Sequence, residues 1–246
     1  MSADLIDFNA MREAGRILAG ALRVVGNLVE PGVTSLDLSK EAEHYIVSHG
    51  GIPAFIGYNG FPEAACVSVS EQVVHAIPTR RILREGDIVS VDCGVIVNGH
   101  YADACRTFPV GKISSQAARL IEVTENSLNA GISQAVPGNR IGHISFAIQH
   151  QVERNGFRVS LDFVGHGIGH KLHQDPQIPN YGKKDTGRLI EVGNCFAIEP
   201  VVFDGPIDYY TEPDKWTVCS KNGNLSAHFE DTIIIGPEGP EIITRI

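Results

Sequence analysis

The stretch "VSVDCGVIVNGHYADACRTFPVG" (residues 89–111) predicts the framework on which the fold is built. Two runs rich in β-formers flank Asn98-Gly99, and Asn-Gly in that setting is the strongest short signal for a β-hairpin with a two-residue turn. The turn fixes the register of the two strands. It therefore also fixes which of their side chains share a face.

The predicted register brings two carboxylates onto one face of the hairpin. Asp92 lies opposite Cys105 and Asp103 opposite Gly94, and Asp103 shares a face with Cys105 because side chains alternate along a strand. The carboxylates are then diagonal neighbours about 5–8 Å apart. Like charges that close repel, so one must take up a proton or a cation must bridge them. The alternative is two separate surface aspartates, which the apolar context of the run disfavours.

Apolar residues recur at helical spacing in three further segments of the chain. Thr34 or Ser35 is a typical capping residue for the second of them. Turn residues break the third segment, and β-like sequence follows it. We expect a helix over 8–29, a second that begins at 34 or 35 and ends before Gly50-Gly51, helices within 114–155 interrupted at Pro137-Gly138, and mostly strands after residue 158.

Two pairs of segments repeat within the chain. Residues 30–51 match residues 136–157, including Pro31/Pro137, Gly32/Gly138, Ser39/Ser145, His44/His150 and Gly50/Gly156. Residues 81–92 match residues 188–199, which pairs Gly86 with Gly193 and Asp92 with Glu199. This period is too long for a solenoid. We expect one α+β domain over 1–246, an internal duplication with halves of roughly 8–110 and 114–240, a pseudo-twofold axis, and an antiparallel sheet backed by helices.

Two more acids stand in apolar, strand-like runs, Glu199 in "CFAIEPVV" and Glu230 in "SAHFEDTIII". Each alone could be a solvated or paired acid at the end of a strand. Four acids at related places in two halves cannot converge without counter-charge, and no lysine or arginine stands at a matching position. Two divalent cations would balance four carboxylates, and such a pair is a common device of hydrolytic enzymes.

The stretch "FVGHGIGHKLHQDP" (residues 163–176) places three histidines among glycines. The dinucleotide pattern needs glycine where His170 stands, and the P-loop pattern needs serine or threonine after the lysine, where Leu172 follows Lys171. A helix is disfavoured by the glycines. We expect an extended segment on which His166 and His170 share a face, although spacing alone does not say which of them binds a metal.

Composition narrows the class of protein. The 246-residue chain has a net charge of −9, whereas a nucleic-acid binder needs a basic face. Its five cysteines form no CxxC pair, which favours free thiols in a reducing compartment. The first 16 residues lack the apolar core of a signal peptide, and no run approaches 18 apolar residues. We therefore expect a cytoplasmic protein that binds neither membranes nor nucleic acid.

With these motifs in view, the chain resembles the type I methionine aminopeptidases of the pita-bread fold, over nearly its whole length. The resemblance implies two divalent metals, cobalt, manganese, iron or zinc, and leaves open a monovalent cation near Ser70. The motifs that carry it are "YNGFPEAACVSVSEQVVHAIP" (58–78), the hairpin stretch above, "GHGIGHKLHQDPQIPNYG" (165–182), "FAIEPVV" (196–202) and "WTVCSKNGNLSAHFEDTI" (216–233).

The resemblance also implies a role for each site residue. Glu199 moves the proton of the attacking water, His173 hydrogen-bonds the scissile carbonyl, and His75 is a second substrate-facing histidine. Asp103 and Glu230 bridge the two metals. The implied metal ligands are Asp92, Asp103, His166, Glu199 and Glu230, and the implied methionine pocket is Tyr58, Phe61, Cys66, Leu172 and Trp216.

Four positions depart from the family pattern. Ser70 stands where asparagine is usual, at a place linked to a monovalent cation in some members, and Ala102 stands where glycine is usual. His170 replaces a basic residue, and Leu172 replaces an aromatic residue beside the methionine pocket. None of them removes an implied ligand, so they bear on side-chain preference, turnover and the monovalent site.

The implied activity is removal of the initiator methionine from nascent chains with a small second residue, by a hydroxide bound to the two metals. A monomer suffices for this activity. Association with the ribosome is compatible with it, although no basic docking tail is visible. The alternatives are an X-Pro aminopeptidase or prolidase, which shares the five ligands, and a metal-free pita-bread protein that only binds its partner.

Overall fold

The computed structural model describes residues 6–246, so the first five residues of the acidic N-terminal segment lie outside it. Its helices are α1 (Phe8–Leu28), α2 (Ser35–Ser48), α3 (Ser115–Ile132) and α4 (Ile141–Glu153), with a short 3₁₀ turn η1 (Tyr58–Gly60). All four long helices lie where the sequence predicted them. Thr34 caps α2 in a reciprocal capping box with Asp37. None of the helices within residues 6–246 is long and apolar enough to cross a membrane.

The strands pair antiparallel throughout the described chain. They form sheets in the orders β1-β4-β2 with β5 on β4, β15-β14-β9-β7-β8, β13-β10-β6 and β11-β12-β3. The strands are β1 (Ile52–Pro53), β2 (Ala65–Val69), β3 (Gln72–Val74), β4 (Ile88–Val97), β5 (His100–Pro109), β6 (Arg158–Val159), β7 (Gly165–Gly167), β8 (Gln174–Ile178), β9 (Cys195–Ile198), β10 (Val201–Phe203), β11 (Tyr209–Thr211), β12 (Val218–Ser220), β13 (Ser226–His228), β14 (Asp231–Gly236) and β15 (Gly239–Ile242).

The hairpin of β4 and β5 has the predicted register. Asp92 pairs with Cys105, and Gly94 pairs with Asp103. Asn98 and Gly99 both adopt left-handed backbone angles, with φ of 48° and 75°, as a type I′ turn requires. The sequence prediction of the hairpin is therefore confirmed.

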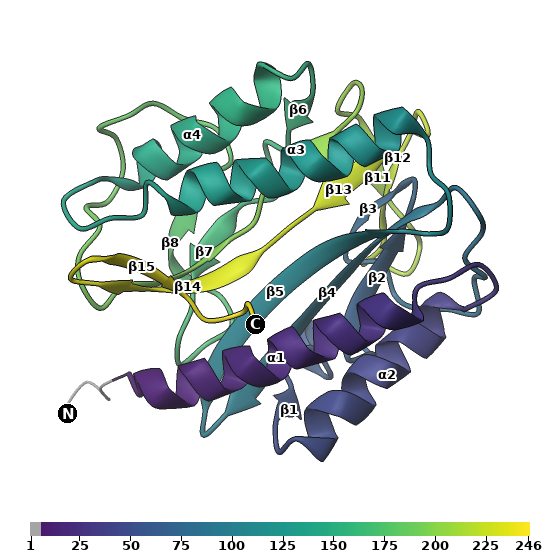
Figure 1. Ribbon diagram of the computed structural model, residues 1–246, viewed down its shortest axis with the longest axis horizontal. Coiled ribbons are helices and arrows are strands. Elements are labelled where there is room, and N and C mark those ends of the chain that lie inside the picture. Colours follow the sequence, from purple (N-terminus) through teal and green to yellow (C-terminus); the bar gives the residue numbers. More distant parts are fainter. Residues whose placement is uncertain (1–5) are drawn as a thin grey trace.

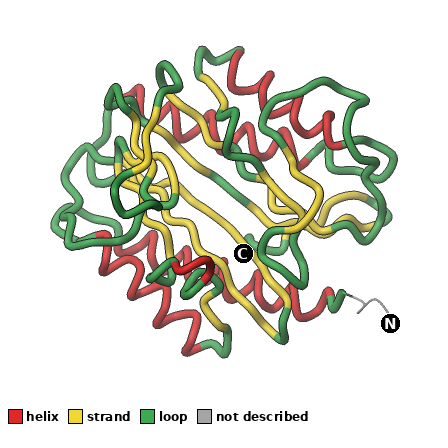
Figure 2. Tube along the Cα trace, turned by 180° about the vertical axis from the view of Figure 1, so that it is seen from behind, coloured by secondary structure: helices red, strands yellow, loops and turns green. Residues whose placement is uncertain are grey.

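The helices lie as two pairs on opposite sides of the strands (Figure 1). Helices α1 and α2 pack on β4, β5 and β2, whereas α3 and α4 pack on strands of the C-terminal part such as β13 and β6. From behind, the strands cross the middle and the helices lie toward two edges (Figure 2). Each helix pair covers its own apolar cluster, and all five cysteines are buried free thiols.

Backbone features recur at the positions that the sequence repeat pairs. Thr34 bridges Ile82, and at the matching positions Arg140 bridges Leu189. Gly32 and Gly138 adopt left-handed φ values of 102° and 91°. These correspondences support the predicted duplication into halves, which remains a prediction.

The contact between α1 and the C-terminal segment gives a test of this packing. A Cβ at Gly15 would lie 2.2 Å from the backbone oxygen of Ile243. Replacing a glycine inside a helix by alanine usually stabilises by about 1 kcal/mol. We expect Gly15→Ala instead to lower the free energy of unfolding by about 1–3 kcal/mol, because α1 must move away from the segment.

Denaturant unfolding measures this change. Asn27→Ala, at an exposed position of the same helix, is the control and should change stability by no more than about 0.5 kcal/mol. A stabilised Gly15→Ala protein would contradict the close approach of α1 to Ile243.

Candidate active site

A cavity of about 340 Å³ is lined on one side by residues of β4 and β5 and on the other by residues of the C-terminal strands, such as β7 and β13. All the site residues that the sequence predicted line it, namely Tyr58, Phe61, Cys66, His75, Asp92, Asp103, His166, Leu172, His173, Glu199, Trp216 and Glu230. The structure therefore brings the predicted residues together. Their individual roles are a separate question.

The four acids come from strands of both halves of the chain. Asp92 lies on β4 and Asp103 on β5, whereas Glu199 directly follows β9 and Glu230 directly precedes β14. A bridge between Cys105 and Glu230 joins β5 to the start of β14, with backbone N···O distances of 3.3 and 3.0 Å. The acids therefore meet where β5 passes the start of β14.

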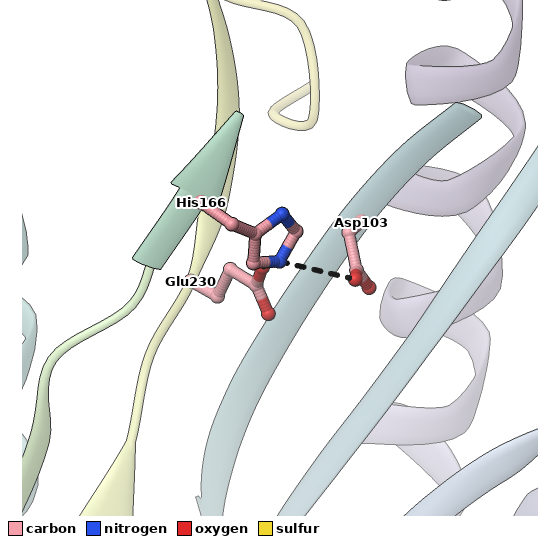
Figure 3. Close-up of side chains that lie close together, drawn as sticks. All are labelled: Asp103, His166 and Glu230. Carbon is pink, nitrogen blue, oxygen red and sulfur yellow. Dashed lines mark ion pairs between the residues drawn. The ribbon is translucent and has the colours of Figure 1, made fainter. Parts of the chain in front are cut away.

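His166 extends from β7 toward these carboxylates (Figure 3). Its Nε2 atom lies 3.6 Å from Glu199 Oε1, 3.9 Å from Glu230 Oε1 and 4.0 Å from Asp103 Oδ2. These separations are too long for hydrogen bonds, but they suit donor atoms that share one cation. Nδ1 lies 3.0 Å from the carbonyl of Gly167, a contact that holds the Nδ1 proton and leaves Nε2 as a ligand.

The residues present fit a divalent cation. Asp103, His166 and Glu230 each offer a ligand atom within 4.8 Å of the others. Asp92 and Glu199 line the same cavity outside this compact group. Asp92 Oδ1, Asp103 Oδ1 and Glu230 Oε1 are buried without a hydrogen-bond partner. Within residues 6–246, no lysine or arginine forms an ion pair with these carboxylates.

Burial sets the protonation of the site in the absence of a cation. It raises the pKa of Asp92 to about 7 and that of Glu199 to about 8. Burial, reinforced by the neighbouring acids, raises the pKa of Asp103 and Glu230 well above the usual range. Burial lowers the pKa of His166 to about 3, so this imidazole is neutral and free to bind a metal.

The three histidines of residues 163–176 do not lie as predicted. Strand β7 ends at Gly167, and turns follow it, so no extended run reaches His170. The ring of His166 lies 4.2 Å from that of His173, whereas His170 packs against His100 at 4.4 Å. The prediction that His166 and His170 share a face was wrong, because the strand ends at Gly167 and the chain bends before His170.

The opposite wall of the cavity is apolar. Phe61 packs edge-on against Trp216 with ring centroids 5.1 Å apart, and Cys66 and Leu172 are buried beside them. The hydroxyl of Tyr58 lies 2.7 Å from His173 Nδ1 at the exposed rim. An apolar pocket thus opens directly next to the carboxylates.

Sequence reasoning missed His228, which also lines the cavity. Its Nε2 atom is buried without a hydrogen-bond partner, 3.6 Å from Glu199 Oε2 and 4.0 Å from Glu230 Oε2. His228 stands two residues before Glu230, and the alternation of side chains along an extended segment could have identified it. Asp162 and Phe163, which also line the cavity, carried no such signal.

The Ser70 side chain, at the position where the family resemblance leaves open a monovalent cation, is hydrogen-bonded to an aspartate. Its hydroxyl donates to Asp87 Oδ1 at 2.8 Å, and its backbone φ is 53°. The monovalent cation remains a prediction.

Comparison with known proteins identifies relatives over nearly the full chain. The sequence profile of metallopeptidase family M24 matches residues 9–237. A protein from Clostridium perfringens named methionine aminopeptidase is 48% identical over 240 residues, which cover 98% of this chain and 96% of the relative. Methionine aminopeptidase 1 of Bacillus subtilis is 45% identical, with 98% of this chain and 97% of the relative covered.

Solved structures give the same picture of the fold. The methionine aminopeptidase of Thermotoga maritima superposes with a TM-score of 0.95 and 42% identity, covering 97% of this chain and 96% of that one. A prolidase from Pyrococcus furiosus superposes with a TM-score of 0.78 at 18% identity, covering 97% of this chain but 64% of that one. The likeness to the prolidase extends to the fold alone.

The raised carboxyl pKa values predict how the stability of the metal-free protein depends on pH. Between pH 7 and 8.5 the unfolded carboxyls are ionised, whereas folded Asp92 and Glu199, with pKa values of about 7 and 8, retain protons. The folded state binds more protons, so its stability falls as pH rises, on the order of 1–2 kcal/mol from these two groups, and the raised pKa values of Asp103 and Glu230 increase the fall. His166, with its pKa of about 3, is neutral when folded and only partly protonated when unfolded near pH 7, so it opposes this fall by a small amount that vanishes as pH rises.

Urea unfolding in EDTA measures this fall. Added divalent metal should abolish it, because a cation holds the carboxylates ionised. A free energy of unfolding that stays constant or rises over this range in EDTA would contradict the raised pKa values of these carboxyls in the metal-free protein.

Proposed function

This chain belongs to metallopeptidase family M24 and has the pita-bread fold, and we propose that it is a methionine aminopeptidase that removes the N-terminal methionine of peptides and nascent proteins with a small second residue. The observation that carries the proposal is the adjacency of two features in one cavity. Two buried and two half-buried carboxylates, with the neutral imidazole of His166, lie beside an apolar pocket that contains a cysteine and a tryptophan. The first set suits hydrolysis, and the second suits a thioether side chain.

We assign the cations to Asp92, Asp103, His166, Glu199 and Glu230, with Asp103 and Glu230 shared between two ions. Cobalt, manganese, iron and zinc all suit these donors. When bound, such cations polarise the scissile carbonyl and lower the pKa of water. The number and identity of the ions are part of the proposal.

Glu199 is the proton carrier of the proposed reaction. Its carboxylate accepts the proton of the attacking water and passes it to the leaving amine. Two observations support this role. Glu199 lines the cavity, and its backbone oxygen accepts a hydrogen bond from the buried side chain of Asn180 at 3.0 Å, which fixes the chain beside the carboxylate.

His173 and His75 bind the substrate in this proposal. His173 donates to the scissile carbonyl, and the contact of its Nδ1 with the hydroxyl of Tyr58 at 2.7 Å orients the ring. Burial lowers the pKa of His75 to about 4, so it is neutral at pH 7. His75 packs edge-on against Phe163, with ring centroids 5.8 Å apart.

The methionine side chain occupies the apolar wall. Phe61, Trp216 and Tyr58 surround it with aromatic surface, and sulfur lies favourably near aromatic rings. Leu172 is the wall residue that departs from the family pattern, and it leaves a buried aliphatic surface where an aromatic ring is usual. We infer a pocket for unbranched, polarisable side chains.

The substrate class points to where the protein acts. Nascent chains carry the initiator methionine, so we propose a cytoplasmic, monomeric enzyme that meets its substrates during or soon after synthesis. Association with the ribosome is an expectation of this proposal.

Peptide hydrolysis tests the activity. Metal-loaded protein should release methionine from Met-Gly-Met-Met and leave Gly-Pro dipeptides and Ala-Pro-Pro peptides intact. Cleavage only before proline would sink the proposal in favour of a prolidase-type enzyme. The absence of both turnover and bound metal would favour a binding protein instead.

The two adjacent histidines separate metal binding from substrate binding. We expect His166→Ala to lose one metal, because it removes the nitrogen ligand, whereas His173→Ala keeps both metals and loses about 10²–10³-fold in kcat, as for a removed oxyanion donor. Elemental analysis and peptide kinetics measure the two effects. His150→Ala, at an exposed position on α4, is the control. Equal metal loss in the His166 and His173 variants would contradict the assignment.

A further inference from the structure

A second set of charged side chains lies behind the carboxylates, on the same two segments that carry them. Side chains alternate along a strand, so Asp103 faces the cavity and Arg106 faces the other side of β5. Glu230 likewise faces the cavity, and its neighbour Asp231 points to the back. Where β5 passes the start of β14, the side that faces the cavity therefore carries acids of like charge, and the opposite side, here called the back, carries an arginine and an aspartate.

Arg106 joins the two segments with both ends of its guanidinium. Nη1 donates to the backbone oxygens of Glu230 at 2.5 Å and Cys105 at 2.8 Å. Nη2 lies 2.5 Å from Asp231 Oδ1. One planar group thus holds β5, the backbone of Glu230 and the side chain of Asp231 in a fixed geometry, which a lysine could not do.

Asp231 is fully buried, with no exposed surface. Its Oδ1 accepts from Thr244 Oγ1 at 2.7 Å, and its Oδ2 lies 2.7 Å from Arg245 Nε and 2.6 Å from Arg245 Nη2. Two guanidinium groups and one hydroxyl therefore satisfy this carboxylate. A buried charge paired so completely is costly to disrupt, because removing one partner leaves the other without compensation.

The two sides of the crossing have opposite electrostatic effects. Ionised Asp103 and Glu230 repel each other across the cavity until a cation neutralises them. Arg106 and Asp231 attract each other behind them, across the backbone bridge of Cys105 and Glu230. The pair at the back opposes the separation that the carboxylates at the front favour.

We propose that Arg106 and Asp231 are positioning residues, which hold Asp103 and Glu230 at cation-binding distance before a cation arrives. Thr244 and Arg245 complete this back-side clamp, defined as Arg106, Asp231, Thr244 and Arg245. The clamp couples the C-terminal segment to the affinity of the metal centre. This inference rests on the metal centre of the proposed function, and it is independent of the substrate.

Cobalt titration of the metal-free protein tests the clamp. Arg106→Gln and Asp231→Asn should bind Co²⁺ about 10–100-fold more weakly than wild type, as for other residues that orient metal ligands. The visible absorption of bound Co²⁺ should also change, because its ligands shift. Arg106→Lys keeps the charge without the fork and should give an intermediate affinity.

Arg12→Gln is the matched control. It removes an arginine of α1 whose Nε lies 2.8 Å from Glu241 Oε1 on β15, the strand that pairs with β14. Both side chains are about half exposed. Its Co²⁺ affinity should stay within about twofold of wild type, since exposed pairs contribute little. Circular dichroism in EDTA establishes that each variant is folded before the titration.

Folded Arg106→Gln and Asp231→Asn proteins with wild-type Co²⁺ affinity and absorption would overturn the proposal, leaving the clamp a purely structural ion pair. If either variant fails to fold, Arg106→Lys and Arg245→Gln are judged by the same criteria. Failure of wild type itself to bind Co²⁺ would overturn the metal centre as well. Failure of the clamp alone leaves wild-type binding intact.

Discussion

The repulsion that four closely placed carboxylates would feel if all were ionised is the constraint on which this structure depends. Asp92, Asp103, Glu199 and Glu230 converge from both groups of strands, and within residues 6–246 no basic side chain forms an ion pair with them. Without a cation, burial keeps protons on these groups and raises their pKa values. In the proposed function, a bound cation offsets the free-energy cost of bringing these acids together.

The neighbouring features follow from that constraint. His166 supplies a neutral nitrogen because its other ring nitrogen contacts the carbonyl of Gly167. The paired charges of Arg106 and Asp231 lie directly behind the repelling ones. The apolar wall with Phe61 and Trp216 lies on the open side, where a substrate side chain can displace water. The proposed metal ligands, the proposed clamp and the apolar wall therefore form one arrangement at the place where β5 passes the start of β14.

Much of this arrangement could be predicted from the sequence because its signals are local. The Asn98-Gly99 turn fixed the register of β4 and β5, and with it the relation of Asp92 to Asp103. Other features depend on contacts between distant segments. The turn that carries His170 to His100 depends on packing after Gly167, and the pairing of Arg106 with Asp231 spans 125 residues. His228 could have been predicted from the alternation of side chains before Glu230, which places it on the same face as that acid.

Anomalous diffraction from crystals of the metal-loaded protein tests the central claim most directly. The account predicts two anomalous peaks in the cavity, with Asp103 and Glu230 contacting both ions and His166 contacting one. A cavity without anomalous peaks under saturating metal, or peaks bound away from Asp103 and Glu230, would contradict it.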